Sequence, residues 1–396
     1  MAAIWAGIDA GKTHHHCVAI DESGRRLLSR RVANDEPELL ELLADVLALG
    51  DEVTWGIDLA DGGAALAIAI LLNHDQPVLY LSGRAIHRAS EGYRGEGKTD
   101  AKDAAVIADQ ARIRRDLHPL LAGDETVTDL KILTGRRMDL VADRTRTVNR
   151  LRAQLTGVFP GLERALDLTN TGPLILLTGY QTPAALRRIG RKRLETWLRN
   201  RKIHRADQLA ETAFQAAERQ RTSLPGERLT ARMVHTLAAE VMALNQQVAE
   251  IDKLIEARFR EHHDFEVITS MPGLGVILGA EFLAATGGDM AIFGTPDRLA
   301  GFGGVAPAPR DSGKISGNLR RPQRYNRRLQ RVFYTSALFS IRRCEESRQF
   351  YDRKRAEGKR HTQAVLALAR RRVNVLWALL RDGRCYELTP PTALAA

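Results

Sequence analysis

Cysteine is scarce in this chain of 396 residues. Cys17, Cys344 and Cys385 are scattered and odd in number, so they form neither a disulfide framework nor a CxxC metal site. No uninterrupted apolar run approaches the ~20 residues of a membrane helix. Asp9 also interrupts the apolar stretch that a secretory signal needs. These absences predict a soluble, cytoplasmic protein in a reducing compartment, with no membrane partner.

Acidic residues are outnumbered. The chain has 59 Lys and Arg against 48 Asp and Glu, a formal net charge of +11 at pH 7. The excess lies near the carboxyl end, because residues 310–384 contain 21 basic and 6 acidic residues. A region of this density is typical of proteins that bind phosphate backbones.

The first 115 residues have an α/β pattern. Apolar or alternating runs predict strands, and helical spacing predicts helices between the later ones. The expected strands are 3–9, 16–21, 26–32, 53–59 and 77–82, and the expected helices are 35–49 and 63–72. Three hairpin-linked strands followed by alternating helices and strands is the order of a ribonuclease-H-like fold, with a mixed sheet in which strands one and four are neighbours.

Two long helical stretches, 125–160 and 228–262, follow in the chain. Their apolar positions recur with the spacing of coiled-coil seams. These positions are Val127, Thr134, Val141, Val148 and Leu155 in the first stretch, and Val241, Leu244, Val248, Ile251 and Ile255 in the second. Between them, residues 186–205 form a basic helical segment, which is either a solvated face or a contact for RNA or DNA.

The predicted fold class is α/β plus α, and the length allows two or three domains. We expect an α/β domain at 1–118 and a coiled-coil region at 119–262 with a basic helical insertion at about 160–226. A mainly helical domain follows at 263–386, with a tail at 387–396. Within that last domain, GFGGVAPAPRDSGKISG is a loop by composition, and RHTQAVLALARRRVNVLWALL predicts a long helix.

Four acids form the first candidate site. Asp9 ends the first expected strand, Asp58 ends the fourth, and KTDAKDA places Asp100 and Asp103 three apart on one helix face. Together they predict an all-oxygen pocket suited to Mg²⁺ or Mn²⁺. Each acid alone is an ordinary turn or helix-start residue, and Asp61 is the alternative to Asp58. The neighbouring His14, His15 and His16 are expected in an exposed turn and are left out of the site.

Several motifs together resemble the DEDD transposases of bacterial insertion sequences, the IS110 family, which is related to the Piv DNA invertases. They are GIDAGKTHHHCVAID, GIDLADGG, KTDAKDAAVIADQAR, MPGLGVILGAEFLAA, FGGVAPAPRDSGKISG and FYDRKRAEGK, in the expected order over nearly the whole chain. The resemblance implies a RuvC-like domain with Asp, Glu, Asp and Asp as metal ligands, then a coiled coil and a transposase domain with a serine nucleophile. By motif position these are Asp9, Asp58, Asp100, Asp103 and Ser312. The second acid departs from the family in being Asp.

Ser312 lies in a Gly-flanked loop near Arg310, Lys314, Arg320 and Arg321. Such a hydroxyl is suited to attack a phosphodiester while cations stabilise the growing charge. Without the resemblance, Ser-Gly is an ordinary turn dipeptide. Tyr325 is the other conceivable nucleophile, but no Arg and His set of a tyrosine recombinase accompanies it. The resemblance further implies a site shared between protomers of a dimer or tetramer.

Two further features predict contacts with nucleic acid. The turn PGLG, with Gly273 and Gly275, resembles a helix-hairpin-helix element that binds phosphate through backbone N–H groups, although a plain helix corner fits as well. The run Arg320, Arg321, Arg324, Arg327, Arg328 and Arg331 predicts phosphate contacts with steep salt dependence. The resemblance implies donor and target DNA as partners and a structured guide (bridge) RNA that pairs with both.

Parts of the sequence also fit two other classes of protein. GIDAGKTH resembles the first phosphate loop of sugar-kinase and actin-like ATPases, but a second glycine-rich phosphate loop and an adenosine motif are missing. A non-catalytic nucleic-acid-binding protein with a degenerate nuclease fold is the other alternative, and the substituted second acid favours it.

Overall fold

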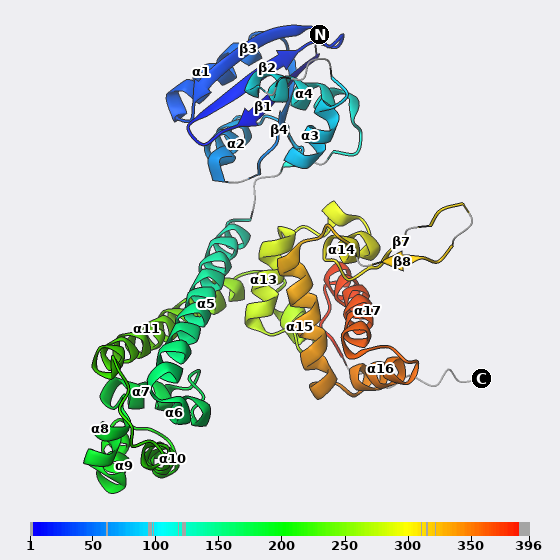
Figure 1. The fold of residues 1–396 in the computed structure, drawn as a ribbon. Coiled ribbons are helices and arrows are strands. Elements are labelled where there is room, and N and C mark those ends of the chain that lie inside the picture. Colours follow the sequence, from blue (N-terminus) through cyan, green and yellow to red (C-terminus); the bar gives the residue numbers. More distant parts are fainter. Residues whose placement is uncertain are drawn as a thin grey trace, which may run out of the picture. The chain divides into compact units, whose positions relative to one another are not determined.

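The computed structural model describes residues 3–60, 62–93, 97, 99–117, 119–120, 124–309, 311–313, 316–320 and 322–387. The predicted site residues Asp61, Arg310, Lys314 and Arg321 lie outside these ranges, as does the predicted tail after residue 387. The chain forms two compact units, Met1–Asp124 and Glu125–Ala396 (Figure 1).

A mixed sheet of six described strands forms the centre of the first unit. Its strands are β1 (Ala3–Ala10), β2 (His14–Ile20), β3 (Arg26–Ala33), β4 (Glu52–Ile57), β5 (Val78–Tyr80) and β6 (Pro119–Leu120). They lie in the order β3-β2-β1-β4-β5-β6. β1 is antiparallel to β2 and parallel to β4. The prediction that strands one and four are neighbours is therefore confirmed.

Helices cover both faces of this sheet. They are α1 (Glu36–Leu47), the short 3-10 helix η1 (Gly62–Ala64), α2 (Ala65–Asn73), α3 (Gly83–Ser90) and α4 (Asp100–Ile113). Ile4 and Ile8 of β1 share a core with α1 and α2, whereas the neighbouring Trp5 packs with residues of α4. This alternation is what a strand buried on both faces requires, because successive side chains point to opposite sides.

The prediction that the three histidines lie in an exposed turn is wrong. His14, His15 and His16 form the start of β2, and His15 is only 1% exposed. Strand alternation carries the His15 ring into the interior. Burial lowers the pKa of His15, and Asn34 and Asp58 oppose this effect. Burial therefore favours the neutral form of the ring.

Two long helices, α5 (Glu125–Val158) and α11 (Glu227–Arg260), begin the second unit and pack against each other. Both were predicted from the sequence nearly to the residue. Most of the predicted seam is buried, including Val148, Leu155 and Val248. Arg258 Nε donates to Asp129 Oδ2 across the pair at 2.8 Å. The seam is thus filled within one chain.

A lobe of short helices, which we call the basic lobe (residues 160–226), connects these two helices. It comprises α6 (Pro160–Ala165), α7 (Thr171–Gly179), α8 (Pro183–Ile189), α9 (Arg191–Arg199) and α10 (Ala206–Glu218). It has an apolar core shared with the adjoining ends of α5 and α11. The predicted basic helical segment is split at Gly190, whose φ of 72° lies in the left-handed region.

The rest of the second unit is mainly helical. Its elements are α12 (Phe265–Ser270), α13 (Val276–Thr286), the 3-10 helix η2 (Ala291–Phe293), α14 (Pro296–Phe302), β7 (Ala308–Pro309), β8 (Leu319–Arg320), α15 (Arg327–Arg343), α16 (Glu345–Ala356) and α17 (His361–Asp382). The predicted last helix is confirmed as α17. One core joins α12–α17 to Leu130 of α5 and to Ile255 and Phe259 of α11. Among the described residues, no helix is both long and apolar enough to cross a bilayer.

Candidate active site

The four predicted acids line one cavity of about 750 Å³ in the first unit. Asp9 lies near the carboxyl end of β1, and Asp58 follows β4 directly. Because β1 and β4 are parallel neighbours, their carboxyl ends meet at the same edge of the sheet. Asp100 and Asp103 reach the cavity from α4. The structure therefore brings together acids from three separate segments of the chain.

Helix α4 positions the second pair of acids. Thr99 is its N-cap, and its Oγ1 accepts the Lys102 N–H at 3.2 Å, so the helix begins at Asp100. Asp100 and Asp103 occupy the first turn, where the helix dipole favours negative charge. Gly7 of β1 lets α4 approach, since a Cβ there would lie 2.2 Å from the Ala104 carbonyl oxygen.

Asp58 is a partly buried acid of the cavity whose surroundings shift its pKa. Burial raises its pKa, the Ala10 N–H that donates to its Oδ1 at 3.1 Å opposes the shift, and the charge of Asp103 adds to it. Carboxylates from three segments are thus gathered at one cavity, and Lys102 also lines it. An oxygen-only donor set of this kind fits a hard divalent cation such as Mg²⁺ or Mn²⁺.

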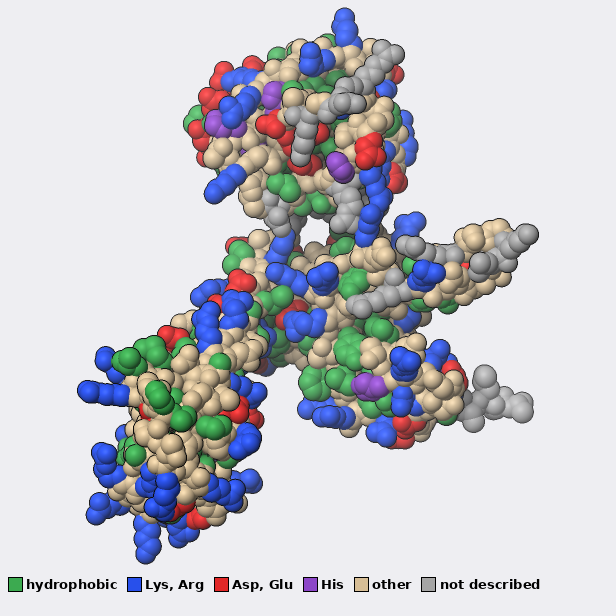
Figure 2. Space-filling model, viewed as in Figure 1, with side chains coloured by type: hydrophobic (Ala, Val, Ile, Leu, Met, Phe, Trp, Pro, Cys, Tyr) green, Lys and Arg blue, Asp and Glu red, His purple; other side chains and the backbone are tan. Residues whose placement is uncertain are grey.

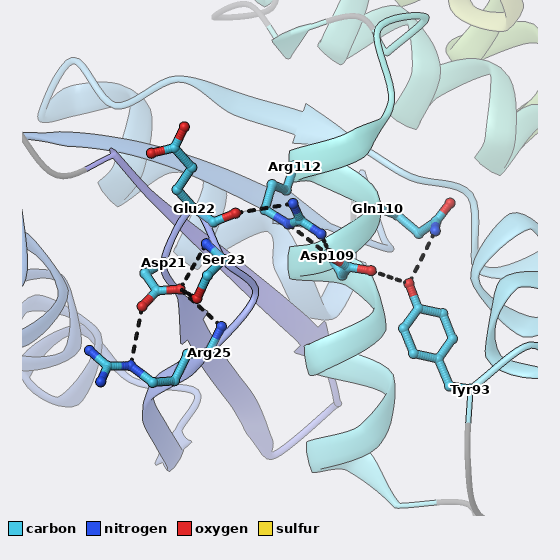
Figure 3. A network of polar contacts seen from close by, with 8 residues as sticks. All are labelled: Asp21, Glu22, Ser23, Arg25, Tyr93, Asp109, Gln110 and Arg112. Atoms are coloured by element: carbon cyan, nitrogen blue, oxygen red, sulfur yellow. Dashed lines mark hydrogen bonds and ion pairs between the residues drawn. The ribbon is translucent and has the colours of Figure 1, made fainter.

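Tyr93 forms part of the cavity wall and was missed by the sequence analysis. Its hydroxyl donates to Asp109 Oδ2 at 2.5 Å and accepts from Gln110 Nε2 at 3.3 Å. Arg112 holds Asp109 through two bonds to Oδ1 and also donates to the Glu22 carbonyl at 3.1 Å. Figure 3 shows this network connecting the Tyr93 ring to α4 and to the turn after β2. Spacing alone gives no signal for Tyr93, because its partners are set by tertiary structure.

Ser312 lies in the second unit, on an exposed loop between the short paired strands β7 and β8. The Asn318 N–H donates to Asp311 Oδ1 at 2.9 Å and so ties the two sides of the loop together. Tyr325, the alternative nucleophile, packs its ring so closely on Gly304 that a Cβ there would lie 2.4 Å from the ring.

The described residues of the predicted arginine run differ in their surroundings. Arg320, Arg324, Arg327 and Arg328 are exposed. Arg331 instead forms an ion pair with Glu281, a carboxylate of α13 that is only 3% exposed. Arg331 therefore joins α15 to α13.

The PGLG turn connects α12 to α13. Gly273 has a φ of 79°, and a Cβ there would lie 2.6 Å from the Ser336 carbonyl oxygen of α15. Arg372 Nη2 donates to the Pro272 carbonyl oxygen and to Ser336 Oγ, which fixes the turn against α15 and α17. Gly275 is the exposed N-cap of α13. Close packing alone thus explains why glycine occupies position 273. Phosphate binding at Gly273 and Gly275 stays a prediction.

Two family models match the parts of the chain that carry these features. A model of DEDD-type transposases matches residues 6–160, which include the four acids, and a second transposase model matches residues 265–352, which include Ser312. The protein is therefore a transposase, a DNA-cutting recombination enzyme. The chain belongs to the IS116/IS110/IS902 family of transposases.

Relatives that match almost the full length of the chain support the same family assignment. The chain is 60% identical to the 42 kDa protein of insertion element IS900 from Mycobacterium paratuberculosis, over 99% of both chains. It is 50% identical to the 44.8 kDa protein of IS116 from Streptomyces clavuligerus, over 99% of this chain and 98% of the relative. The IS110 protein of Streptomyces coelicolor is 38% identical over 99% and 97%. The predicted family and enzyme class are confirmed, and the ATPase and non-catalytic alternatives gain no support.

Proposed function

We propose that this transposase cuts and rejoins the DNA strands of an insertion sequence at a divalent cation held by Asp9, Asp58, Asp100 and Asp103. The observation that supports this most is the convergence of the four acids on one cavity. The strand order, with β1–β3 antiparallel and β4 and β5 parallel to β1, supports an RNase H-like (RuvC-like) domain.

The residues of the cavity have distinct roles in this proposal. Bound Mg²⁺ or Mn²⁺ supplies electrophilic activation of the scissile phosphate. Asp58 is shorter by one methylene than the Glu of the family pattern, and the Ala10 N–H directs its carboxylate toward β1. Asp100 and Asp103 are positioned by the N-cap of α4, and Tyr93 lines the same cavity.

Ser312 is the proposed nucleophile. Its Oγ attacks the phosphorus and loses its proton, the P–O bond to the leaving strand breaks, and the leaving hydroxyl takes a proton. The phosphoserine ester conserves the energy of the broken bond for rejoining. The exposure of Ser312 on a tied loop supports access by a DNA strand. In this proposal Ser312 and the acids of one site come from different protomers of a dimer or tetramer.

Single-residue variants test the proposed nucleophile and the proposed metal ligands separately. Ser312→Ala is expected to abolish the covalent protein–DNA product in a denaturing gel while leaving DNA binding intact. Ser316→Ala, in the same exposed loop, is the matched control. A full yield of covalent product from Ser312→Ala would remove the serine from the mechanism.

The acids are tested by Asp100→Asn and Asp103→Asn, each of which is expected to eliminate Mg²⁺-dependent cutting. Asp75→Asn is the control, because Asp75 is exposed and Asn readily adopts its φ of 56°. Undiminished cutting by either active-site variant would exclude that residue from the site.

In this proposal, a structured guide RNA that pairs with donor and target DNA determines which DNA sequences the protein recombines. The test is to purify the protein from cells that carry its native flanking DNA and to sequence the nucleic acid that accompanies it. One discrete structured RNA supports the guide, whereas random fragments contradict it.

A further inference from the structure

The basic lobe carries a concentrated positive surface far along the chain from the four acids and from Ser312. Residues 186–205 contain nine Lys and Arg and one acid, Glu195. Figure 2 shows Lys and Arg side chains gathered over the part of the lobe that contains α8 and α9. We propose that this surface binds the phosphate backbone of double-stranded DNA outside the segment that is cut. The inference rests on the proposed function, since it supplies a second contact for the same substrate.

The apolar core of the lobe is built without most of these cations; Arg187 is an exception, since it donates to the Ala217 and Gln220 carbonyl oxygens inside the lobe. The core consists of apolar side chains on the opposite helix faces, such as the fully buried Leu194 and Leu198 of α9 and Ala210 of α10. Lys192 and Arg193 of α9 are exposed. The exposed charged side chains are therefore presented to solvent from helix faces that lie outside this core.

Most of the charge is also not neutralised by the chain. Arg191 pairs with Glu211, and Arg199 pairs with Glu195. Five other cations have no hydrogen-bond or ion-pair partner among the residues that the structure describes. They are Arg188, Lys192, Arg193, Lys202 and Arg205, and all five are exposed. Unpaired charges at this density repel one another, and a polyanion relieves that repulsion.

Two of these cations occupy backbone positions that disfavour them. Lys202 and Arg205 have φ values of 58° and 55°, and Asp75 is the third described non-glycine residue with a positive φ. Lys202 ends α9 at the position where glycine is usual, as the bonds from Lys202 N to Arg199 O and from Ile203 N to Leu198 O show. Glycine would relieve the backbone strain at both positions, yet both carry a basic side chain. This indicates that positive charge at this turn matters more than an unstrained backbone.

The surface fits a duplex better than a single strand. Single-strand binding relies on exposed aromatic rings that stack on bases. Trp197, the aromatic residue of α9, is instead covered by Arg201 at 3.7 Å from its ring and by the edge of Tyr180. The exposed groups are guanidinium and ammonium groups, which bind phosphates without reading sequence.

The test compares two triple variants of the full chain with equal loss of charge. The lobe variant is Arg188→Gln, Lys192→Gln and Arg193→Gln. The control is Arg25→Gln, Arg146→Gln and Arg260→Gln, whose exposed arginines each pair with an acid on the same element or turn. The dissociation constant of a 40-base-pair DNA duplex of unrelated sequence is measured by fluorescence anisotropy in EDTA, over a series of salt concentrations.

For the lobe variant we expect DNA binding to weaken by about tenfold or more and the slope of log K against log salt to fall by roughly 2–3 units. The control is expected to stay near wild type, and melting temperatures verify folding. Equal effects of the two variants overturn the proposal. Weakened binding of an RNA duplex of the same sequence, with unchanged DNA binding, also overturns it and assigns the surface to RNA.

Failure of this inference is distinguishable from failure of the proposed function. Asp103→Asn is expected to bind the duplex like wild type and to lose cutting. If the lobe variant binds like wild type while Asp103→Asn loses cutting, the lobe proposal fails and the active site stands. If Asp103→Asn cuts normally, the proposed active site fails whatever the lobe variant does.

Discussion

Asp58 has a carboxylate that the fold itself disfavours in its charged form. Burial and the charge of Asp103 raise its pKa, although Ala10 donates a hydrogen bond to it. A group with a raised pKa in the folded state stabilises the fold at low pH, and this contribution is lost as the pH rises through that pKa. In the absence of a bound metal ion, the ionised Asp58 carboxylate therefore destabilises the folded protein at neutral pH.

Asp58→Asn is accordingly expected to raise the melting temperature in EDTA at pH 7. The gain should shrink as the pH falls through the raised pKa and vanish near pH 3.5, where the aspartate is also protonated. Addition of Mg²⁺ at about ten times its dissociation constant should stabilise wild type by ~1.4 kcal/mol and the variant by less. Thermal unfolding from pH 3.5 to 8 measures both effects, and a variant that Mg²⁺ stabilises as well as wild type contradicts the assignment of Asp58.

Lys202 offers a test in which stability and binding move in opposite directions. Lys202→Gly removes the left-handed strain and is expected to raise the free energy of unfolding by up to ~1 kcal/mol. The same change should weaken duplex DNA binding severalfold, because it removes an unpaired cation. Asp75→Gly is the control, since it relieves similar strain in the first unit and should leave DNA affinity unchanged. Weakened binding by both variants, or by neither, contradicts a role for Lys202.

At the scale of elements, the contact between β1 and α4 sets the distance between the two pairs of acids. Gly7 is the closest point, where a Cβ would lie 2.2 Å from Ala104 O and 2.4 Å from Ala108 N, both backbone atoms of α4. Backbone atoms in a helix cannot rotate aside as a side chain can. Any side chain at Gly7 must therefore displace α4, and with it Asp100 and Asp103, relative to Asp9.

Gly7→Ala is expected to destabilise the protein by about 1–3 kcal/mol and to reduce cutting by roughly 100-fold, although Gly7 touches no substrate. Gly135→Ala, in the open middle of α5 with nothing near the added Cβ, should instead stabilise slightly. Cutting is measured at a temperature where both variants are folded by circular dichroism. Normal cutting by a folded Gly7→Ala variant would show that the α4 position does not control the site.

The elements that sequence predicted well are those whose cause is local. Periodicity was sufficient for β1, β4, α5 and α11, and the strand order then placed Asp9 beside Asp58. His15 was misplaced because its identity suggested a turn, while the strand alternation that buries it depends on pairing with β1. Tyr93 was missed because its partner Asp109 is brought to it only by the packing of α3 on α4.

At the scale of the whole molecule, the residues proposed to be functional are divided between two units. The four acids belong to Met1–Asp124, and Ser312 and the basic lobe belong to Glu125–Ala396. The predicted coiled-coil seam is filled by α5 and α11 of the same chain. In the proposed dimer or tetramer, contact between protomers therefore uses outward-facing residues, and sequence periodicity gives no information about these.

A mixture of two inactive variants tests whether a site is shared between protomers. Asp103→Asn lacks a proposed metal ligand and Ser312→Ala lacks the proposed nucleophile, so neither is expected to form the covalent DNA product alone. In a dimer with shared sites, a mixed dimer has one site built from the intact acids of one protomer and the intact serine of the other. Random exchange in an equal mixture should then restore about a quarter of the wild-type yield. If each site is built within one protomer, no mixed dimer contains an intact site and the mixture stays inactive. The double variant Asp103→Asn, Ser312→Ala mixed with either single variant is the control, because that mixture contains no complete site in either arrangement.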